Sequence, residues 1–410
     1  MTYHRDYGMS YVLSKLLEEL GHECYIVSTE NYVSKDTKLS NPDAIFFMTA
    51  NATKTIIEHY PNSKLFFCSA EGHLEKTLDE EYFIKNYNLT ENFVNFFFWG
   101  KNSLYKFRKI LYEAALSNEL KNKLFKKCLI LGHPRLDMIK FAKKKKKTKR
   151  LQIGFIGIGH YLSRIDDLRL STDVIDREFN NFEDRIIHMV YSANQLKTYV
   201  KIIKKLGFEK YEYSYRPYPQ ESRKAIKATK LYKEKKISIS NELDFGTWVS
   251  KQDLIIGDIT EAFTYIYASK KPYICIAKVM GKPALEDLGW LDPTIRKLKK
   301  NLHTSMPNNF NLLLQNIKSK NVSENYSSVL RNQIQNVFNF KKDSVLKKIS
   351  YNIDKGLKNK KRNLGIPFFL IKILRNILPL NHNDSYSKIS TDNKSINKEL
   401  KSVIESLIKN

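Results

Sequence analysis

Short apolar runs alternate with segments of helical periodicity along the first 280 residues of the chain. The apolar runs predict strands at residues 23–28, 43–48, 64–68, 95–99, 128–131, 151–156, 211–216, 237–240, 253–257 and 272–276. Apolar residues at helical spacing predict helices at residues 11–20, 53–60, 103–111, 186–206 and 243–249, and further helices at 280–300 and 310–340. Strands that alternate with helices in this way predict an α/β fold with parallel sheets.

The stretch at residues 253–276 has the pattern of one βαβ unit. An apolar strand leads into a turn, a helix capped near Asp258 or Thr260, and a second apolar strand after Pro272. A parallel sheet binds anions at the carboxyl ends of its strands, where the next helix presents unpaired N–H groups. We therefore predict a phosphate-bearing ligand near Asp258, Thr260 and Glu261. The alternative is a purely structural unit, because every α/β domain repeats this pattern.

Two other predicted strand ends carry residues suited to substrate chemistry. Glu71 follows the strand at 64–68 and is suited to act as a general base or to bind an acceptor; a solvated loop carboxylate is the alternative. Gly157, Gly159 and His160 follow the strand at 151–156. Glycines at this place let the backbone approach a phosphate, although their spacing fits neither common phosphate-loop pattern.

A third strand end, after residues 211–216, lies beside two prolines. Pro217 and Pro219 exclude a helix and hold an extended turn, which aims Arg216 and Tyr218 beyond the end of the sheet. An arginine held in this way is suited to bind a phosphate or a carboxylate. A structural salt bridge is the alternative role for Arg216.

The length of 410 residues is enough for two cores and an appendage. We predict an N-terminal α/β domain at 1–142, a basic linker at 143–150 and a second α/β domain at 151–300. Helices at 301–340 are expected to pack back on the domains, and 341–410 to form a basic, partly amphipathic extension. An α/β domain normally opens with a strand and this chain does not, so either the sheet lacks that strand or the chain starts inside a longer protein.

The charge is strongly basic, with 70 Lys and Arg against 43 Asp and Glu. A field of this sign attracts nucleic acid, an anionic membrane or phosphorylated substrates. Nucleic acid is disfavoured, because the sequence contains no recognised binding module. Residues 365–380 are too short and too charged to cross a bilayer, and beside a polybasic patch they predict an interfacial helix on anionic lipid. A helix docked on the protein's own core is the alternative.

The cysteines and the N-terminus bear on the compartment. Cys24, Cys68, Cys128 and Cys275 are widely spaced, without metal-ligand spacing, and are interpreted as free thiols of a reducing cytoplasm. The N-terminus has no apolar signal segment. We therefore expect a cytoplasmic protein, peripheral on the inner face of the cell membrane.

Several strings, in their order along the chain, resemble those of bacterial surface-carbohydrate biosynthesis proteins, the GT-B-like enzymes of capsule and lipopolysaccharide synthesis. The strings are Glu71-Gly72, Gly132 to Asp137, Ile153 to Gly157, Arg216 to Glu221, and Asp258 to Thr260 with Lys271-Pro272. The resemblance implies two Rossmann-like domains whose parallel sheets face a cleft. It also implies glycosyl transfer from a nucleotide-activated donor. The string from Gly132 to Asp137 is the most specific of these, and the resemblance implies that its residues His133, Arg135 and Asp137 lie at the hinge and cleft.

The sequence departs from that family at Tyr218. The family usually carries a histidine between the two prolines, similar to an element that sialyl- and Kdo-transferases use on the nucleotide phosphate. A tyrosine still donates one hydrogen bond but does not become cationic near neutral pH. The turn at Asp258 and Lys271-Pro272 are also similar to CDP-glycerol glycerophosphotransferases. A polyol-phosphate transferase and a non-catalytic GT-B-like protein therefore stay open beside a glycosyltransferase.

The resemblance implies a mechanism in which the donor is a substrate and no cofactor takes part. The donor phosphates would lie near Gly157 to His160, Arg216, Tyr218 and the turn from Asp258 to Glu261, with Glu71 on the acceptor side. No Asp-x-Asp string follows a predicted strand, so we expect no metal ion. The expected partners are a CMP-sugar or other nucleotide-sugar, a growing glycan or lipid-linked acceptor, and the anionic membrane through the basic C-terminal region.

Overall fold

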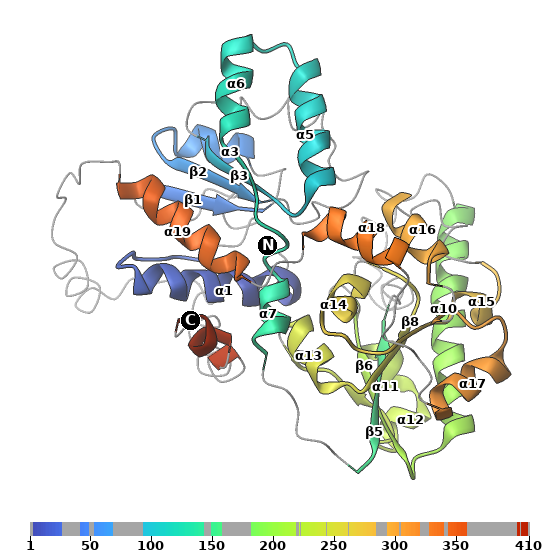
Figure 1. Ribbon diagram of the computed structural model, residues 1–410. Coiled ribbons are helices and arrows are strands. Elements are labelled where there is room, and N and C mark those ends of the chain that lie inside the picture. The colour runs from blue at the N-terminus through green and yellow to red at the C-terminus, as the bar shows by residue number, and fades with distance from the viewer. Residues whose placement is uncertain are drawn as a thin grey trace.

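The structure, a computed structural model, is an α/β protein with two parallel sheets (Figure 1). It describes residues 3–26, 42–48, 53–68, 93–142, 149–157, 182–218, 221, 223–242, 244–260, 262–283, 293–302, 305–319, 328–339, 343–358, 400–401 and 403–408.

The first sheet has four parallel strands in the order β1-β2-β3-β4. Phenylalanines fill the space between this sheet and α5, where the ring of Phe107 lies 5.0 Å from that of Phe96 and 5.1 Å from that of Phe98. The elements are α1 (Tyr3–Glu19), β1 (Ala44–Phe47), α3 (Thr53–His59), β2 (Lys64–Cys68), β3 (Phe93–Phe98), α5 (Lys101–Glu113), α6 (Asn118–Lys126), β4 (Cys128–Ile130) and α7 (Leu136–Lys140).

The second sheet has five parallel strands in the order β7-β6-β5-β8-β9. Its central strand β5 pairs with β6 on one side and β8 on the other, and Ile153 lies opposite Tyr213 and Leu254. The elements are β5 (Leu151–Ile156), α10 (Phe182–Leu206), β6 (Tyr211–Arg216), α11 (Lys224–Ala228), α12 (Lys230–Lys233), β7 (Ser238–Ile239), α13 (Phe245–Lys251), β8 (Leu254–Gly257), α14 (Ala262–Ala268), β9 (Tyr273–Cys275) and α15 (Ala277–Met280).

The two parallel sheets confirm the predicted fold class. Most expected strands are present, but the strand predicted at 23–28 is wrong in its described part, since residues 23–26 have no strand partner. Gly21 follows the end of α1 with φ of +87°, and residues 22–26 form neither helix nor strand. The helix predicted at 280–300 is also interrupted after α15, where Gly281 again adopts a positive φ of +87°.

The C-terminal helices return to both halves of the molecule. They are α16 (Pro293–Lys300), α17 (Phe310–Ser319), α18 (Ser328–Phe338) and α19 (Val345–Lys358). Helix α18 packs on α5, and α19 packs on α1, β2 and β3 with Leu346, Ile349 and Ile353 buried. The sequence assigned 341–410 to a basic extension, whereas the structure makes 345–358 part of the first half. The predicted interfacial helix at 365–380 lies outside the described residues.

One continuous hydrophobic cluster joins the two sheets. Phe66, Phe97 and Trp99 of the first half and Ile153 and Phe155 of the second belong to it. In the part of the chain that the structure describes, no helix has both the length and the apolar composition needed to cross a bilayer.

Gly100, which caps α5 after β3, tests how tightly α18 packs. A Cβ at this position would collide with the backbone of Asn336 and Val337. We expect Gly100→Ala to lower the free energy of unfolding by about 1–3 kcal/mol, the usual range for overpacking. Urea unfolding measures this change. Gly8→Ala in α1 is the control, because its Cβ would meet the nearest atom at 3.5 Å. Equal effects of the two substitutions would contradict the packing described.

Candidate functional site

The carboxyl ends of β6, β5 and β8 lie side by side at one edge of the second sheet. The chain leaves β5 through Gly157, whose N–H donates to the carbonyl of Arg216 at 2.8 Å. It leaves β8 through Asp258 and Thr260. The structure therefore brings these four predicted residues to one edge. Glu71, Gly159, His160 and Glu261 lie outside the described residues.

A carboxylate holds the turn that carries Tyr218. Glu221 accepts a hydrogen bond from the Tyr215 hydroxyl at 2.6 Å and another from the Tyr218 backbone N–H at 2.9 Å. Burial, and then the Glu221 charge, raise the pKa of Tyr215 well above its ordinary value, so this phenol stays a donor. A Cβ on Gly157 would collide with both side chains. The side chain of Tyr218 is 40% exposed at this edge.

Arg216 is directed across the sheet toward the end of β7. Its side chain is buried, and Nη1 donates to Ser240 Oγ at 2.8 Å and to the carbonyl of Glu242. Burial opposes ionisation of the Glu242 carboxyl, but hydrogen bonds from Lys251 and Ser240 outweigh it and lower the pKa. Arg216 is thus held within the second half by hydrogen bonds to Ser240 and to the Glu242 backbone. Its contact with a donor phosphate stays a prediction.

Asp258 is the centre of a buried polar cluster at the end of β8. Its carboxylate is inaccessible to solvent, accepts from the Tyr191 hydroxyl at 2.9 Å and lies 3.3 Å from Lys299 Nζ. The Cys275 thiol donates to it at 3.4 Å. Burial, and then Asp258, raise the pKa of Tyr191 well above its ordinary value. Tyr191 belongs to α10 and Lys299 to α16. Their contacts with Asp258 therefore connect these two helices to the candidate edge.

Sequence reasoning missed Lys299 and Tyr191. Lys299 stands in the run Lys297-Leu298-Lys299-Lys300 and is buried, while its basic neighbours on either side are exposed. The local signal in the sequence is the apolar Leu298 beside Lys299, and the structure buries both side chains. Thr260 Oγ1 accepts from the Ala262 N–H at 3.2 Å at the start of α14, where the sequence predicted a helix cap near Asp258 or Thr260.

The string from Gly132 to Asp137 lies at the junction of the two halves. The His133 ring stacks on Trp99, with centroids 3.7 Å apart and planes at 11°, and meets the edge of Tyr265 from α14 at 5.4 Å. Arg135 Nη1 donates to the Tyr265 hydroxyl at 3.2 Å. Both side chains are buried. The predicted hinge residues therefore form a packed joint between β3, β4 and the second half.

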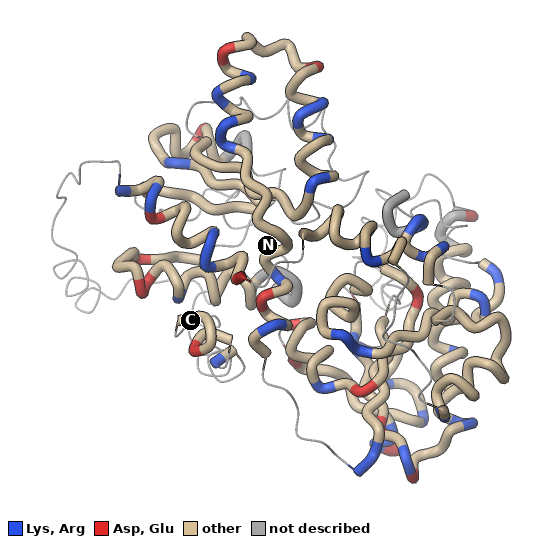
Figure 2. Tube along the Cα trace, viewed as in Figure 1, with Lys and Arg blue, Asp and Glu red and all other residues tan. Residues whose placement is uncertain are grey.

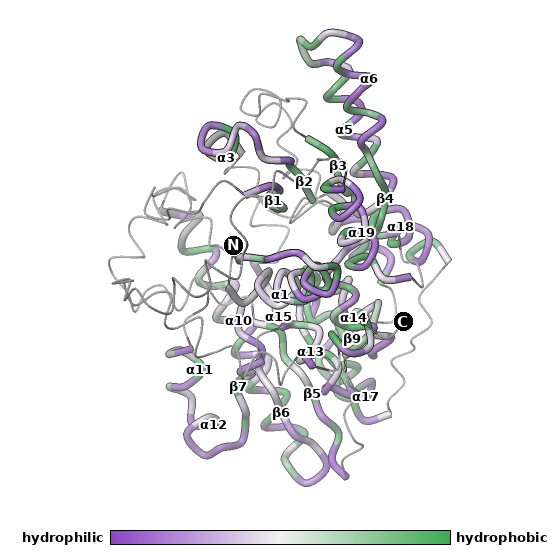
Figure 3. The backbone as a smooth tube through the Cα atoms, turned by 90° about the vertical axis from the view of Figure 1, so that its left-hand side faces the viewer, coloured by the Kyte–Doolittle hydropathy of each residue, from purple (hydrophilic) through white to green (hydrophobic). Residues whose placement is uncertain are grey.

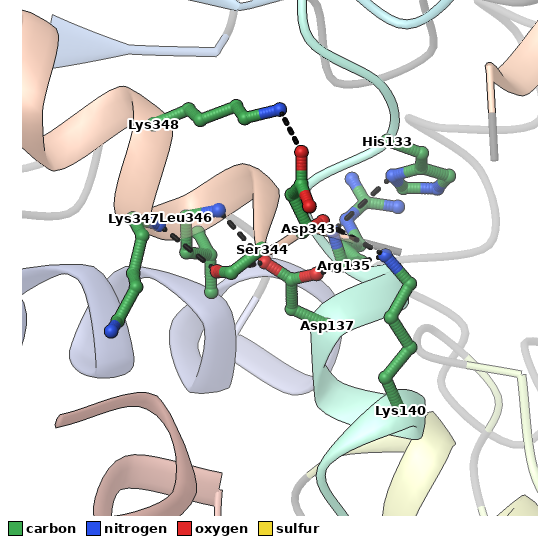
Figure 4. A network of polar contacts seen from close by, with 9 residues as sticks. All are labelled: His133, Arg135, Asp137, Lys140, Asp343, Ser344, Leu346, Lys347 and Lys348. Carbon is green, nitrogen blue, oxygen red and sulfur yellow. Dashed lines mark hydrogen bonds and ion pairs between the residues drawn. The ribbon is translucent and has the colours of Figure 1, made fainter. Parts of the chain in front are cut away.

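Asp137 fastens this joint to the C-terminal helices (Figure 4). It accepts from Ser344 Oγ and from the Leu346 N–H, each at 2.8 Å, and lies 3.3 Å from Lys140 Nζ. Ser344 also accepts from the Lys347 N–H at 3.1 Å and so caps α19. Burial raises the pKa of the Asp137 carboxyl group, against the opposing effect of these hydrogen bonds and of Lys140.

The cysteines are free thiols, as predicted, with Cys68 and Cys275 buried and Cys24 and Cys128 partly buried. Burial raises the pKa of Cys68 and of Cys128 to about 12, so both are protonated near neutral pH. Within the described ranges, no three His, Cys, Asp or Glu side chains gather in a group that could hold a metal ion. The expectation of metal-independent chemistry stays a prediction.

Asp137→Ala tests the fastening of α19. The substitution leaves the Ser344 hydroxyl and the Leu346 N–H buried without their acceptor, and we expect a loss of about 2–4 kcal/mol in the free energy of unfolding. Asp343→Ala is the matched control: the Asp343 carboxylate is exposed and pairs with Lys348, so its loss should change stability by less than about 0.5 kcal/mol. A loss for Asp137→Ala no larger than the control's would refute the fastening role.

A double-mutant cycle tests the pair of Asp258 and Lys299. Lys299→Met leaves a buried charge uncompensated and should cost about 3–5 kcal/mol of stability, whereas adding Asp258→Asn should restore part of it. The coupling free energy is measured by urea unfolding. The exposed pair of Glu119 and Lys123, 3.1 Å apart, serves as the control, with an expected coupling below about 0.5 kcal/mol. A coupling of similar size in both pairs would contradict the burial of the first.

No family model and no curated protein matches the chain. Among solved structures, the UDP-GlcNAc 2-epimerase of Methanocaldococcus jannaschii is 13% identical with a TM-score of 0.42, over 84% of this chain and 81% of that one. MnaA of S. aureus, solved with UDP, is 13% identical with a TM-score of 0.43, over 86% and 84%. A variant of the wall teichoic acid polymerase TagF is 12% identical with a TM-score of 0.41, over 87% and 98%. We draw no conclusion about activity from likenesses at this level.

Proposed function

We propose that this chain is a glycosyltransferase that moves a sugar from a nucleotide-activated donor to a growing surface polysaccharide or lipid-linked glycan. The order of the second sheet, β7-β6-β5-β8-β9, is the observation that supports the proposal most directly. The chain builds outward from β5 through β6 to β7, then crosses to β8 on the other side. A parallel sheet binds its ligand in the crevice outside such a reversal of strand order.

The residues after β5 and β8 suit a phosphate. Gly157 fixes the backbone after β5, because it is buried and its N–H donates to the Arg216 carbonyl, and the partly exposed Thr260 follows β8. Arg216 ends the neighbouring strand β6, and Ser240 at the end of β7 fixes its positively charged group. Such preorganised groups would stabilise the negative charge that develops on the leaving nucleotide, which is commonly the largest contribution to group transfer. Tyr218, partly exposed, would contact the donor beside them.

On the acceptor side, Glu71 is our candidate for a general base or an orienting carboxylate. It follows β2, whose carboxyl end lies in the first sheet. The donor is a substrate, and we propose that neither a cofactor nor a metal ion takes part. The enzyme would work in the cytoplasm at the inner face of the membrane, where a lipid-linked glycan is exposed.

A polyol-phosphate transferase is the second candidate, because the same edge would hold a cytidine diphosphate carrying glycerol. The two differ in the bond that breaks: CMP-sugars release CMP when the sugar leaves, and CDP-glycerol releases CMP when glycerol phosphate leaves. Assays with each donor, followed by analysis of the acceptor for sugar or for phosphate, separate them. A degenerate protein, suggested by Tyr218, would bind nucleotide without transferring either group.

Nucleotide binding at the β5/β8 edge is the direct test. A thermal-shift screen with CMP, CDP, UDP and GDP should show that at least one raises Tm, since a ligand of the folded state stabilises it. Thr260→Val should weaken that nucleotide's binding about tenfold, through loss of one hydrogen bond to a charged group. Glu71→Ala should leave nucleotide binding intact and lower transfer by about 10²-fold or more.

Thr229→Val is the control for Thr260→Val. Thr229 caps α12 by accepting from the Tyr232 N–H at 3.3 Å, so its loss removes a comparable local hydrogen bond away from the candidate edge. This control should keep full nucleotide affinity. If no nucleotide raises Tm, or if the two valine variants bind equally well, the proposed donor site is wrong.

A further inference from the structure

Helices α5 and α6 form a hairpin that projects from the first sheet. Figure 1 shows both helices extending beyond the strands, and Figure 3, turned by 90°, shows the same projection. The inner face of α5 is firmly held, because Phe107, Ile110 and Leu111 are buried and α18 packs on this helix. The outer face of the hairpin is therefore a fixed surface.

Two tyrosines stand on that outer face. Tyr105 is 71% exposed and Tyr112 is 77% exposed, the highest values among the exposed large hydrophobic residues of the described chain. They are seven residues apart in one helix, which places them on the same side with an offset of about 20°. Neither ring is buried in the protein's own core. This ridge of aromatic rings faces solvent.

Basic residues share the outer face of the hairpin with the two tyrosines. Lys101, Arg108 and Lys109 are exposed on α5 and fall within the same arc of about 100° as the tyrosines. Lys121 of α6 lies 5.9 Å from the centroid of the Tyr112 ring and donates to the Tyr112 carbonyl at 2.9 Å. Residues 101–127 carry eight Lys and Arg against two Glu, and Figure 2 shows the blue positions along both helices.

From this combination we infer that the α5–α6 hairpin binds an anionic lipid bilayer. Tyrosine rings are suited to the headgroup level, because the ring is apolar and the hydroxyl stays hydrated. Lysine and arginine around them are attracted by the negative surface potential of the leaflet. Single-stranded nucleic acid is bound instead by aromatic platforms inside a basic groove. Here the rings lie on the outside of a projecting hairpin, which suits a flat surface.

The biological role of this membrane contact rests on the proposed function, because a transferase with a lipid-linked acceptor must work at a membrane. The contact lies in the first half, on the domain predicted to receive the acceptor. The basic C-terminal region was the contact expected from the sequence. The hairpin would orient the first sheet toward the lipid, whether or not that region also binds.

Vesicle co-sedimentation of the full-length protein tests the inference without any nucleotide. We expect binding to vesicles of phosphatidylglycerol mixed into phosphatidylcholine and little binding to phosphatidylcholine alone. Arg108→Gln with Lys109→Gln should weaken partitioning about 30-fold, because each basic residue near such a surface contributes about fivefold. Tyr105→Ala with Tyr112→Ala should weaken it as well. Tyr112→Trp should show a blue-shifted emission on addition of the anionic vesicles.

Matched changes elsewhere serve as controls. Lys230→Gln with Lys233→Gln removes two exposed lysines of α12, and Tyr351→Ala removes a ring that is 62% exposed on α19. Neither should change partitioning by more than about twofold. The inference is overturned if the hairpin variants and the controls lose binding equally, if binding is lost only with Lys360→Gln and Lys361→Gln, or if the hairpin variants weaken binding of single-stranded RNA and not of vesicles. A failure here leaves the nucleotide result unaffected.

Discussion

The stacking of His133 on Trp99 is the contact on which the joint between the two halves depends. Trp99 follows β3 and His133 follows β4, so the stack lies at the end of the first sheet. Tyr265 reaches it from α14 of the second half, and Phe338 from α18. The buried His133 ring therefore meets aromatic rings from three other parts of the chain. A change in the angle between the halves would have to break this aromatic packing.

Buried charges in this protein are compensated locally. Arg135 and Asp137 contact Tyr265 and Ser344, while Arg216 and Asp258 contact Ser240 and Lys299. An isolated charge in a protein interior is strongly unfavourable. These partners replace the hydrogen bonds that water would otherwise make to the charged groups. These contacts make the charged side chains rigid, which matters for function. The edge of the second sheet is held in place by the protein before any ligand arrives, which is the condition for electrostatic stabilisation of a transition state.

The proposed donor edge and the proposed lipid surface lie on different halves. The donor edge belongs to the second sheet, and the hairpin of α5 and α6 rests on the first. A transferase of lipid-linked glycans needs such a division, because the donor arrives from water and the acceptor from the bilayer. The packed joint at His133 and the fastening of α19 by Asp137 would set the distance between the two surfaces.

The sequence by itself determined the fold class and most of its strands, because the alternation of apolar runs and helical periodicity is local. It also located Gly157, Arg216 and Asp258 at strand ends. Tertiary structure alone decided their partners: Tyr191 lies 67 positions from Asp258, and Ser344 lies 207 positions from Asp137. The strand order around β5 and the inward packing of α19 were also decided there. Periodicity specifies which face of an element is buried, but not which distant element covers it, and that choice depends on the packing of the whole chain.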